Sequence, residues 1–106
     1  MLEPFFDPDF AELFVQANAD FDALTDAQRI QVLAVQQTTI RLWEEAFYQY
    51  RGGRLDKTIW DPMVKQYSSY LSIQAFQRTW ELRHSAYGDE FVEFVNGLTQ
   101  LEYKIK

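Results

Sequence analysis

Residues 25–53 read TDAQRIQVLAVQQTTIRLWEEAFYQYRGG, and this stretch decides the fold. It begins with a capping box, in which the side chain of Thr25 caps a helix and that of Gln28 reaches back to the cap. Neither proline nor glycine follows until Gly52, which is expected to supply the left-handed residue that ends a helix. The stretch therefore predicts a helix over about 26–51, roughly 39 Å long at the α-helical rise.

The apolar residues of this predicted helix cover more than one stripe. Ile40 and Phe47 fall on one side, whereas Trp43 and Tyr50 extend the apolar surface around the other. This pattern is typical of a helix that is covered from two directions. We expect a central helix along which the rest of the chain packs, with Trp43 largely buried.

Toward the N-terminus, Asp7-Pro8 is typical of a helix start, with aspartate as the cap and proline in the first helical position. Apolar residues then recur at spacings of three and four, which predicts a helix over 8–18. Residues 1–6 precede this start and are expected to form a flexible or tethering N-terminal segment.

Toward the C-terminus, Asp56 can cap a third helix, but Pro62 follows it closely. Proline inside a helix removes one hydrogen bond and clashes with the preceding turn. We therefore expect 57–60 to form a separate turn and a helix to run over 62–71, capped by Asp61. A kinked helix that continues through the proline is the alternative.

Two further helices are expected beyond this point. Ser72 can cap a helix over 73–84, and Asp89 or Ser85 can cap a helix over 89–99. The last six residues have no need to be ordered. The sequence thus predicts an all-α fold, a five-helix bundle around one long central helix, as a single helical domain over 1–106.

Composition excludes several kinds of site. The 106 residues include no cysteine and one histidine, His84, which excludes disulfides, thiolate metal sites, cysteine nucleophiles and sites with two imidazoles from one chain. The net charge of −6 argues against nucleic acid and anionic membranes as partners. No apolar run approaches the ~18 residues of a spanning helix, so we expect no direct membrane insertion. The expected location is the cytoplasm, or the inner membrane surface if a tether lies outside this sequence.

Charge is distributed unevenly along the chain. Residues 1–28 hold seven acidic groups and no lysine or arginine. The basic residues Arg51, Arg54 and Lys57 lie close together around the glycine pair. We expect them to be the electrostatic partner of the acidic quarter, within one chain or across a dimer.

Several motifs recur together in one known group of proteins. The segment 41–56, RLWEEAFYQYRGGRLD, is followed by Trp60, by WELR at 80–83 and by an aromatic-valine pattern over 91–95. As a set, over roughly residues 7–97, they resemble the soluble helical region of a group of small bacterial proteins of unknown function, usually anchored by a single membrane span. The resemblance implies a helical fold and brings no activity with it. This sequence departs from the group in showing no membrane helix.

Candidate catalytic residues are few. Glu81 and His84 have the spacing of a di-iron motif, but such a site needs two of these motifs, and the chain has one histidine. Glu44 falls in the apolar stripe of the central helix, where we expect it to pair with Arg78 or Arg83. A carboxylate of raised pKa in an apolar cleft is the catalytic alternative. We predict no catalytic, cofactor-binding or metal-binding residue, no cofactor, and a protein that is not an enzyme.

Eighteen of the 106 residues are aromatic, more than one small core is expected to bury. Some of them could line a ligand pocket between the central helix and the helices that follow it, and this pocket would use Trp43, Phe47, Tyr67 and Trp80. Others could form an interface, where tyrosine and phenylalanine are enriched. That interface would use Phe5, Phe6, Tyr48, Tyr50, Arg51, Arg54 and Lys57.

We interpret the chain as a non-enzymatic helical interaction or sensory module with a protein partner, which can be a second copy in a homodimer. One alternative is a domain that binds a small apolar ligand. Another is an acidic inhibitor of a nucleic-acid-binding protein, in which the carboxylates of residues 7–26 imitate phosphates.

Overall fold

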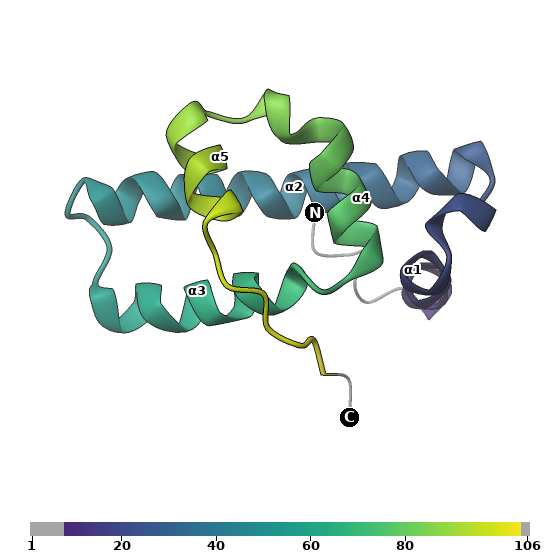
Figure 1. The fold of residues 1–106 in the computed structure, drawn as a ribbon, viewed down its shortest axis with the longest axis horizontal. Coiled ribbons are helices and arrows are strands. Elements are labelled where there is room, and N and C mark those ends of the chain that lie inside the picture. The colour runs from purple at the N-terminus through teal and green to yellow at the C-terminus, as the bar shows by residue number, and fades with distance from the viewer. Residues whose placement is uncertain (1–7, 105–106) are drawn as a thin grey trace.

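Helix α2 (Asp26–Arg51) runs along the longest axis of the molecule, which measures 42 Å against 30 and 26 Å for the other two axes (Figure 1). The structure is a computed structural model and describes residues 8–104. Within that range the chain forms five α-helices, two short 3₁₀ helices and no strand. The predicted all-α fold around one long helix is confirmed. The N-terminal segment expected over 1–6 lies outside the described residues.

The capping box of α2 is present as predicted. Thr25 Oγ1 accepts a hydrogen bond from Gln28 N at 3.2 Å, and Gln28 Oε1 accepts one from Thr25 N at 2.9 Å. At the other end the prediction was wrong by one residue. Gly52 has an ordinary φ of −81°, and Gly53 takes the left-handed conformation with a φ of +75°. A Cβ on Gly53 would meet nothing within 4 Å, so its φ is what favours glycine there.

Helix α1 (Pro8–Ala19) packs near the first half of α2, and the 3₁₀ helix η2 (Phe21–Ala23) connects the two (Figure 1). Phe10, Leu13 and Ala17 form the buried face of α1, as their spacing predicts. This face contacts α4 (Gln74–Arg83) as well as α2. The N-terminal part of the chain is therefore held between the central helix and a helix from the second half of the sequence.

Helix α3 (Lys57–Tyr70) contradicts the expected start at Pro62. It begins directly after Asp56, whose Oδ1 accepts a hydrogen bond from Thr58 N at 2.8 Å. Asp61, the expected cap, instead accepts a 2.8 Å ion-pair hydrogen bond from Lys57 Nζ. Pro62 lies inside the helix. The proline costs one backbone hydrogen bond, but a start at 57 also places Trp60 in the core, where it is 5% exposed.

The expected caps of the last two helices were wrong as well. Ser72 does not cap α4; its hydroxyl donates to Ser69 O, and Gln74 N donates to Asn18 Oδ1 at 2.6 Å instead. Helix α5 (Asp89–Asn96) follows a second 3₁₀ helix, η3 (His84–Ala86), and has no side-chain cap of its own. It ends at Asn96, three residues before the expected end.

The core is built mainly from aromatic rings on α2, α3, α4 and α5. Trp43, which is 4% exposed, stacks on Tyr67 with 3.8 Å between ring centroids, and Phe76 lies at 5.3 Å. Farther along α2, Phe47 packs between Phe91 at 5.6 Å and Phe94 at 4.9 Å. The predicted burial of Trp43 is confirmed. Among the described residues, no helix combines the length and the apolar character needed to cross a membrane.

Candidate functional site

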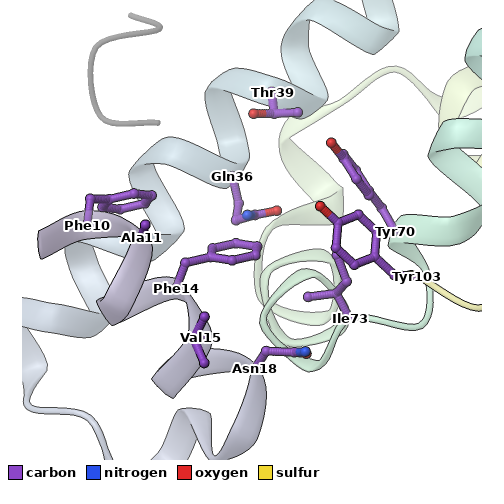
Figure 2. A pocket seen from close by; sticks show the side chains of 10 residues that line it. All are labelled: Phe10, Ala11, Phe14, Val15, Asn18, Gln36, Thr39, Tyr70, Ile73 and Tyr103. Atoms are coloured by element: carbon purple, nitrogen blue, oxygen red, sulfur yellow. The ribbon is translucent and has the colours of Figure 1, made fainter. Parts of the chain in front are cut away.

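A cavity of about 310 Å³ lies where α1, α2, the start of α4 and the C-terminal segment meet (Figure 2). Helix α1 forms one wall, because residues 10, 11, 14 and 15 recur at helical spacing on one side of it. The apolar residues of the lining are Phe10, Ala11, Phe14, Val15 and Ile73. The cavity is partly open to solvent, and Val15 and Tyr103 of its lining are 62% and 37% exposed.

The polar residues of the lining come from three other parts of the chain as well as from α1, and they are Asn18, Gln36, Thr39, Tyr70 and Tyr103. Several of them already have partners. Asn18 Oδ1 accepts from Gln74 N, and Thr39 Oγ1 donates to Val35 O at 3.2 Å. The hydroxyl of Tyr70 accepts from Gln66 Nε2 at 3.3 Å and keeps its own proton to donate.

Gln36 differs from these residues because it is buried and has no partner. Its side chain lines the cavity and the residue is 5% exposed, yet within residues 8–104 its carboxamide makes no hydrogen bond. Figure 2 shows this carboxamide directed away from α2 into the space among Phe14, Tyr70 and Tyr103. A carboxamide offers two N–H donors and a carbonyl acceptor, and in this partly open cavity these groups are available to a bound molecule.

The C-terminal segment forms the remaining wall. Leu101 N donates to Ser68 O at 3.0 Å, and Tyr103 N donates to Ser72 Oγ at 2.9 Å. These bonds place the Tyr103 ring against that of Tyr70, with 5.4 Å between centroids. Order in this segment was not predicted from the sequence. Over residues 101–104 the segment is held by hydrogen bonds from backbone N–H groups. Every residue type except proline has such a group, so these bonds cannot be recognised in the sequence.

Charge is absent from the lining described above. None of the ten lining residues is ionised at neutral pH, and burial, followed by the proximity of Tyr103, raises the pKa of the Tyr70 hydroxyl above its usual value. The walls therefore offer hydrogen bonds and apolar surface but no counter-charge.

The four residues expected to line a ligand pocket lie elsewhere. Trp43 and Tyr67 are stacked in the core, and Trp80 is held by a 2.9 Å hydrogen bond from its Nε1 to Asn96 Oδ1. Phe47 is 6% exposed and reaches the floor of a shallow hollow on another face. None of the four lines the 310 Å³ cavity. The structure brings them together as core rather than around this space.

One feature of the sequence of α2 indicates the observed cavity. Val32, Gln36 and Ile40 are spaced four apart and share one face of the helix. Val32 and Ile40 are fully buried, so Gln36 is a polar residue in an apolar stripe. Such a residue is unfavourable unless it finds a partner, and it marks a position worth testing for a ligand.

The residues expected at an interface are dispersed. Phe5 and Phe6 lie outside the described residues. Tyr48 is 38% exposed, whereas Tyr50 is half-buried and stacked on Trp60 at 5.1 Å between centroids. Beside Tyr48, a shallow hollow has an apolar floor and a charged rim, formed by Phe47, Arg51, Glu90, Glu93, Phe94, Gly97 and Leu98.

The expected pairing of the basic cluster with the acidic quarter is contradicted within the described chain. Arg51 pairs with Glu90, and Lys57 pairs with Asp61. In the acidic quarter, Asp22 pairs with Arg78 at 3.2 Å. Arg51 and Lys57 have nearer carboxylates than the N-terminal ones, because α3 and α5 bring their own acidic residues to that end of α2. Among the described residues, Arg54 forms no ion pair. Arg54 is exposed.

Glu44 is paired, but with a different arginine from the two expected. Its Oε1 accepts from Arg41 Nη1 at 2.5 Å and its Oε2 accepts from Gly88 N at 2.7 Å. Arg41 Nη2 also donates to Ala86 O at 3.1 Å, and its guanidinium lies 4.4 Å over the ring of Tyr87. Both oxygens of Glu44 are thus used to fix the connection between α4 and α5 on α2.

Other candidate chemical groups lie apart. His84 is exposed at the end of α4, where its ring lies 6.2 Å from that of Trp80. Within residues 8–104, histidine and acidic side chains nowhere form a group of three or more that could hold a metal ion.

Comparison of the chain with known protein families, with curated proteins and with solved structures finds no match. The resemblance to a group of membrane-anchored bacterial proteins stays a prediction.

Proposed function

We propose that the chain is a non-enzymatic helical sensory module whose input is a small, mainly apolar molecule bound in the cavity beside α1. The observation that carries this proposal is a 310 Å³ space with an apolar wall beside a core that is filled by aromatic and aliphatic side chains. Ligand sites in proteins are mostly apolar, with a few well-placed polar groups, and occupy about 300–1,000 Å³. The cavity has that composition and lies at the lower end of that range.

The position of the cavity suits a sensory role. Its walls come from α1, α2, the start of α4 and the C-terminal segment, so a bound molecule would contact elements that are far apart in sequence. A ligand that binds only the folded state stabilises it, and the stabilisation grows with the logarithm of ligand concentration once the site is largely occupied. A ligand would therefore strengthen the attachment of α1 and of the C-terminal segment to the rest of the molecule, and a protein partner could read that change.

Filling the cavity tests the proposal. Ala11 lines the cavity, whereas Ala19 is exposed on the same helix outside it. We expect naphthalene to shift the amide NMR signals of α1 and of residues 70–74 in the wild type. Ala11→Phe should abolish these shifts because its ring occupies the space, and Ala19→Phe should leave them unchanged. Saturating naphthalene that shifts none of these signals in the wild type would refute the proposal.

Self-association is a second candidate function, favoured by the exposed ring of Tyr48 and the apolar hollow beside it. We propose a homodimer at micromolar concentration that buries this surface between two copies of the chain. An apolar floor with a charged rim has the anatomy of a protein interface. Exposed ion pairs contribute about 0–1 kcal/mol, so the binding energy would come from the apolar part.

Sedimentation equilibrium tests the dimer. Tyr48→Asp places a charge in the proposed interface and should shift the protein to monomer. Ile30→Asp is the matched control, because Ile30 is 66% exposed near the opposite end of α2. A monomer mass for the wild type at micromolar concentration, or equal dissociation in both variants, would remove the dimer from consideration.

A further inference from the structure

The unpartnered carboxamide of Gln36 identifies the chemical class of the ligand. This residue is 5% exposed, lines the cavity and has no hydrogen-bond partner within residues 8–104. Its neighbours in the buried stripe of α2 are aliphatic, so the position is one that an apolar residue would fill at lower cost. Sites where a protein departs from local packing rules are often functional.

The lining also defines the charge of the ligand. Among the described residues, none of the ten that line the cavity is charged at neutral pH. Burial raises the pKa of the Tyr70 hydroxyl from a value that already lies well above neutral pH. An ion transferred into such a space would lose its hydration without gaining a counter-charge. A neutral molecule suffers no such penalty.

The hydrogen-bonding pattern narrows the class further. A carboxamide presents its donor and its acceptor side by side, and the group that satisfies both at once carries an adjacent acceptor and donor of its own. Amides and lactams have this arrangement, and they match the Gln36 carboxamide in either of its two orientations. Figure 2 shows the side chains of Tyr70 and Tyr103 on the same side of the cavity, and their hydroxyl groups add further hydrogen-bonding groups to the lining.

Volume limits the body of the ligand. A cavity of about 150 Å³ accommodates benzene. The cavity of about 310 Å³ is twice as large and is walled by the rings of Phe10 and Phe14. A flat body of two fused rings, or an aliphatic group of similar size, fits these dimensions.

We propose that the cavity binds a neutral amide or lactam carried on an apolar body, with Gln36 as the residue that pairs with the amide head. This assignment rests on the proposed ligand-binding function. It adds a recognition residue and a ligand class, and either assignment can be wrong while the cavity still binds apolar molecules.

Three probes of matched size test it on the full chain: naphthalene, 2-naphthamide and 2-naphthoate, each titrated calorimetrically at neutral pH. We expect 2-naphthamide to bind about tenfold more tightly than naphthalene, the effect of one or two added hydrogen bonds. We expect 2-naphthoate to bind most weakly. Gln36→Leu should remove the preference for the amide and keep the affinity for naphthalene.

Gln31→Leu is the matched control, because Gln31 is exposed on the same helix and lies outside the cavity lining. It should keep the preference for the amide. If none of the probes binds, the proposed function itself fails. If naphthalene and 2-naphthamide bind equally well, or Gln36→Leu keeps the preference, the inference is wrong while the binding function stands. Tighter binding of 2-naphthoate would show that the ligand class is anionic.

A second readout needs no ligand. If Gln36 serves a ligand rather than the fold, Gln36→Leu and the nearly isosteric Gln36→Met should melt at the same temperature as the wild type or at a higher one. A lower melting temperature in both variants would show that the carboxamide stabilises the fold, and this would overturn its assignment as a recognition residue.

Discussion

Trp43 is the residue on which most of the core depends. Its ring contacts Tyr67, Tyr70 and Phe76, which belong to two other helices. Trp43→Ala should lower the free energy of unfolding by about 3–5 kcal/mol in urea melts, the range for removal of a large buried aromatic side chain. Leu42→Ala is the control, because Leu42 is 52% exposed and should change stability by about 0.5 kcal/mol or less. A loss below about 1 kcal/mol for Trp43→Ala would contradict its central position.

Glu44 holds the connection between α4 and α5 in place through two hydrogen bonds, one to Arg41 and one to Gly88 N. Glu44→Ala removes both and leaves a backbone N–H unsatisfied. We expect a loss of about 1.5–3 kcal/mol, the range for hydrogen bonds to charged groups. Glu44→Gln keeps an acceptor for Gly88 N and should lose less. Equal effects of Glu44→Ala and Glu45→Ala, the exposed neighbour, would contradict this role.

At the scale of the residue, the sequence predicted which side chains are buried better than it predicted which residues they pair with. The spacing of Trp43 predicts its burial, because helical periodicity alone determines which residues share a face. The partner of Glu44 was predicted wrongly. The observed partner, Arg41, lies three residues earlier on the same helix, whereas the prediction assigned Arg78 or Arg83 from α4.

At the scale of the element, a helix end was predictable where its cap is local. The residues of the Thr25 capping box lie three apart and can be recognised in the sequence. The N-terminus of α4 is capped by Asn18, which lies 56 residues earlier in the chain. No local pattern reveals such a cap, so the prediction assigned Ser72. For α3, the penalty for Pro62 was correctly recognised, but the gain from burying Trp60 depends on packing and was not included.

Two hydrogen bonds of Gln74 attach the start of α4 to the end of α1 and to η2. Asn18 Oδ1 accepts from Gln74 N at 2.6 Å, and Gln74 Oε1 accepts from Phe21 N at 2.8 Å. Asn18→Ala should cost about 1 kcal/mol, as for loss of a helix cap, and should speed hydrogen exchange at the Gln74 amide. Gln16→Ala, at an exposed position of α1, is the control. Unchanged exchange at the Gln74 amide would show that the cap does not form.

At the scale of the whole molecule, the sequence predicted a long helix with four others around it but not the position of the cavity. Periodicity indicates which faces are apolar, whereas a cavity is the space left after those faces have packed. Phe10 and Phe14 lie four residues apart on the face of α1 that packs on the core, yet nothing in their spacing indicates that this face is incompletely filled. The fourth wall comes from Tyr103, in a segment that follows the last helix and has no helical pattern.

Because several tyrosines are buried, the stability of the molecule depends on pH in the alkaline range. Burial, assisted by nearby Tyr70, raises the pKa of Tyr67 to about 12, and burial is also the main cause of the raised pKa values of Tyr70 and Tyr87. An unfolded tyrosine loses its proton near pH ~10. Between these two values the unfolded chain binds fewer protons than the folded one, so stability falls as pH rises. Below the unfolded value these hydroxyls are protonated in both states and contribute no pH dependence.

Urea denaturation at a series of pH values measures this effect. The free energy of unfolding should fall from about pH 10 upward, and tyrosinate absorbance should appear together with unfolding. Tyr67→Phe removes the most strongly shifted hydroxyl and should make the fall shallower, whereas Tyr48→Phe, at a residue that is 38% exposed, should not. Lysine and arginine also titrate at alkaline pH, but their contribution is common to the wild type and both variants. Parallel curves for the wild type and Tyr67→Phe would mean that the Tyr67 hydroxyl is reached by solvent in the folded state, and that the aromatic core around Trp43 is more open than its stacked rings indicate.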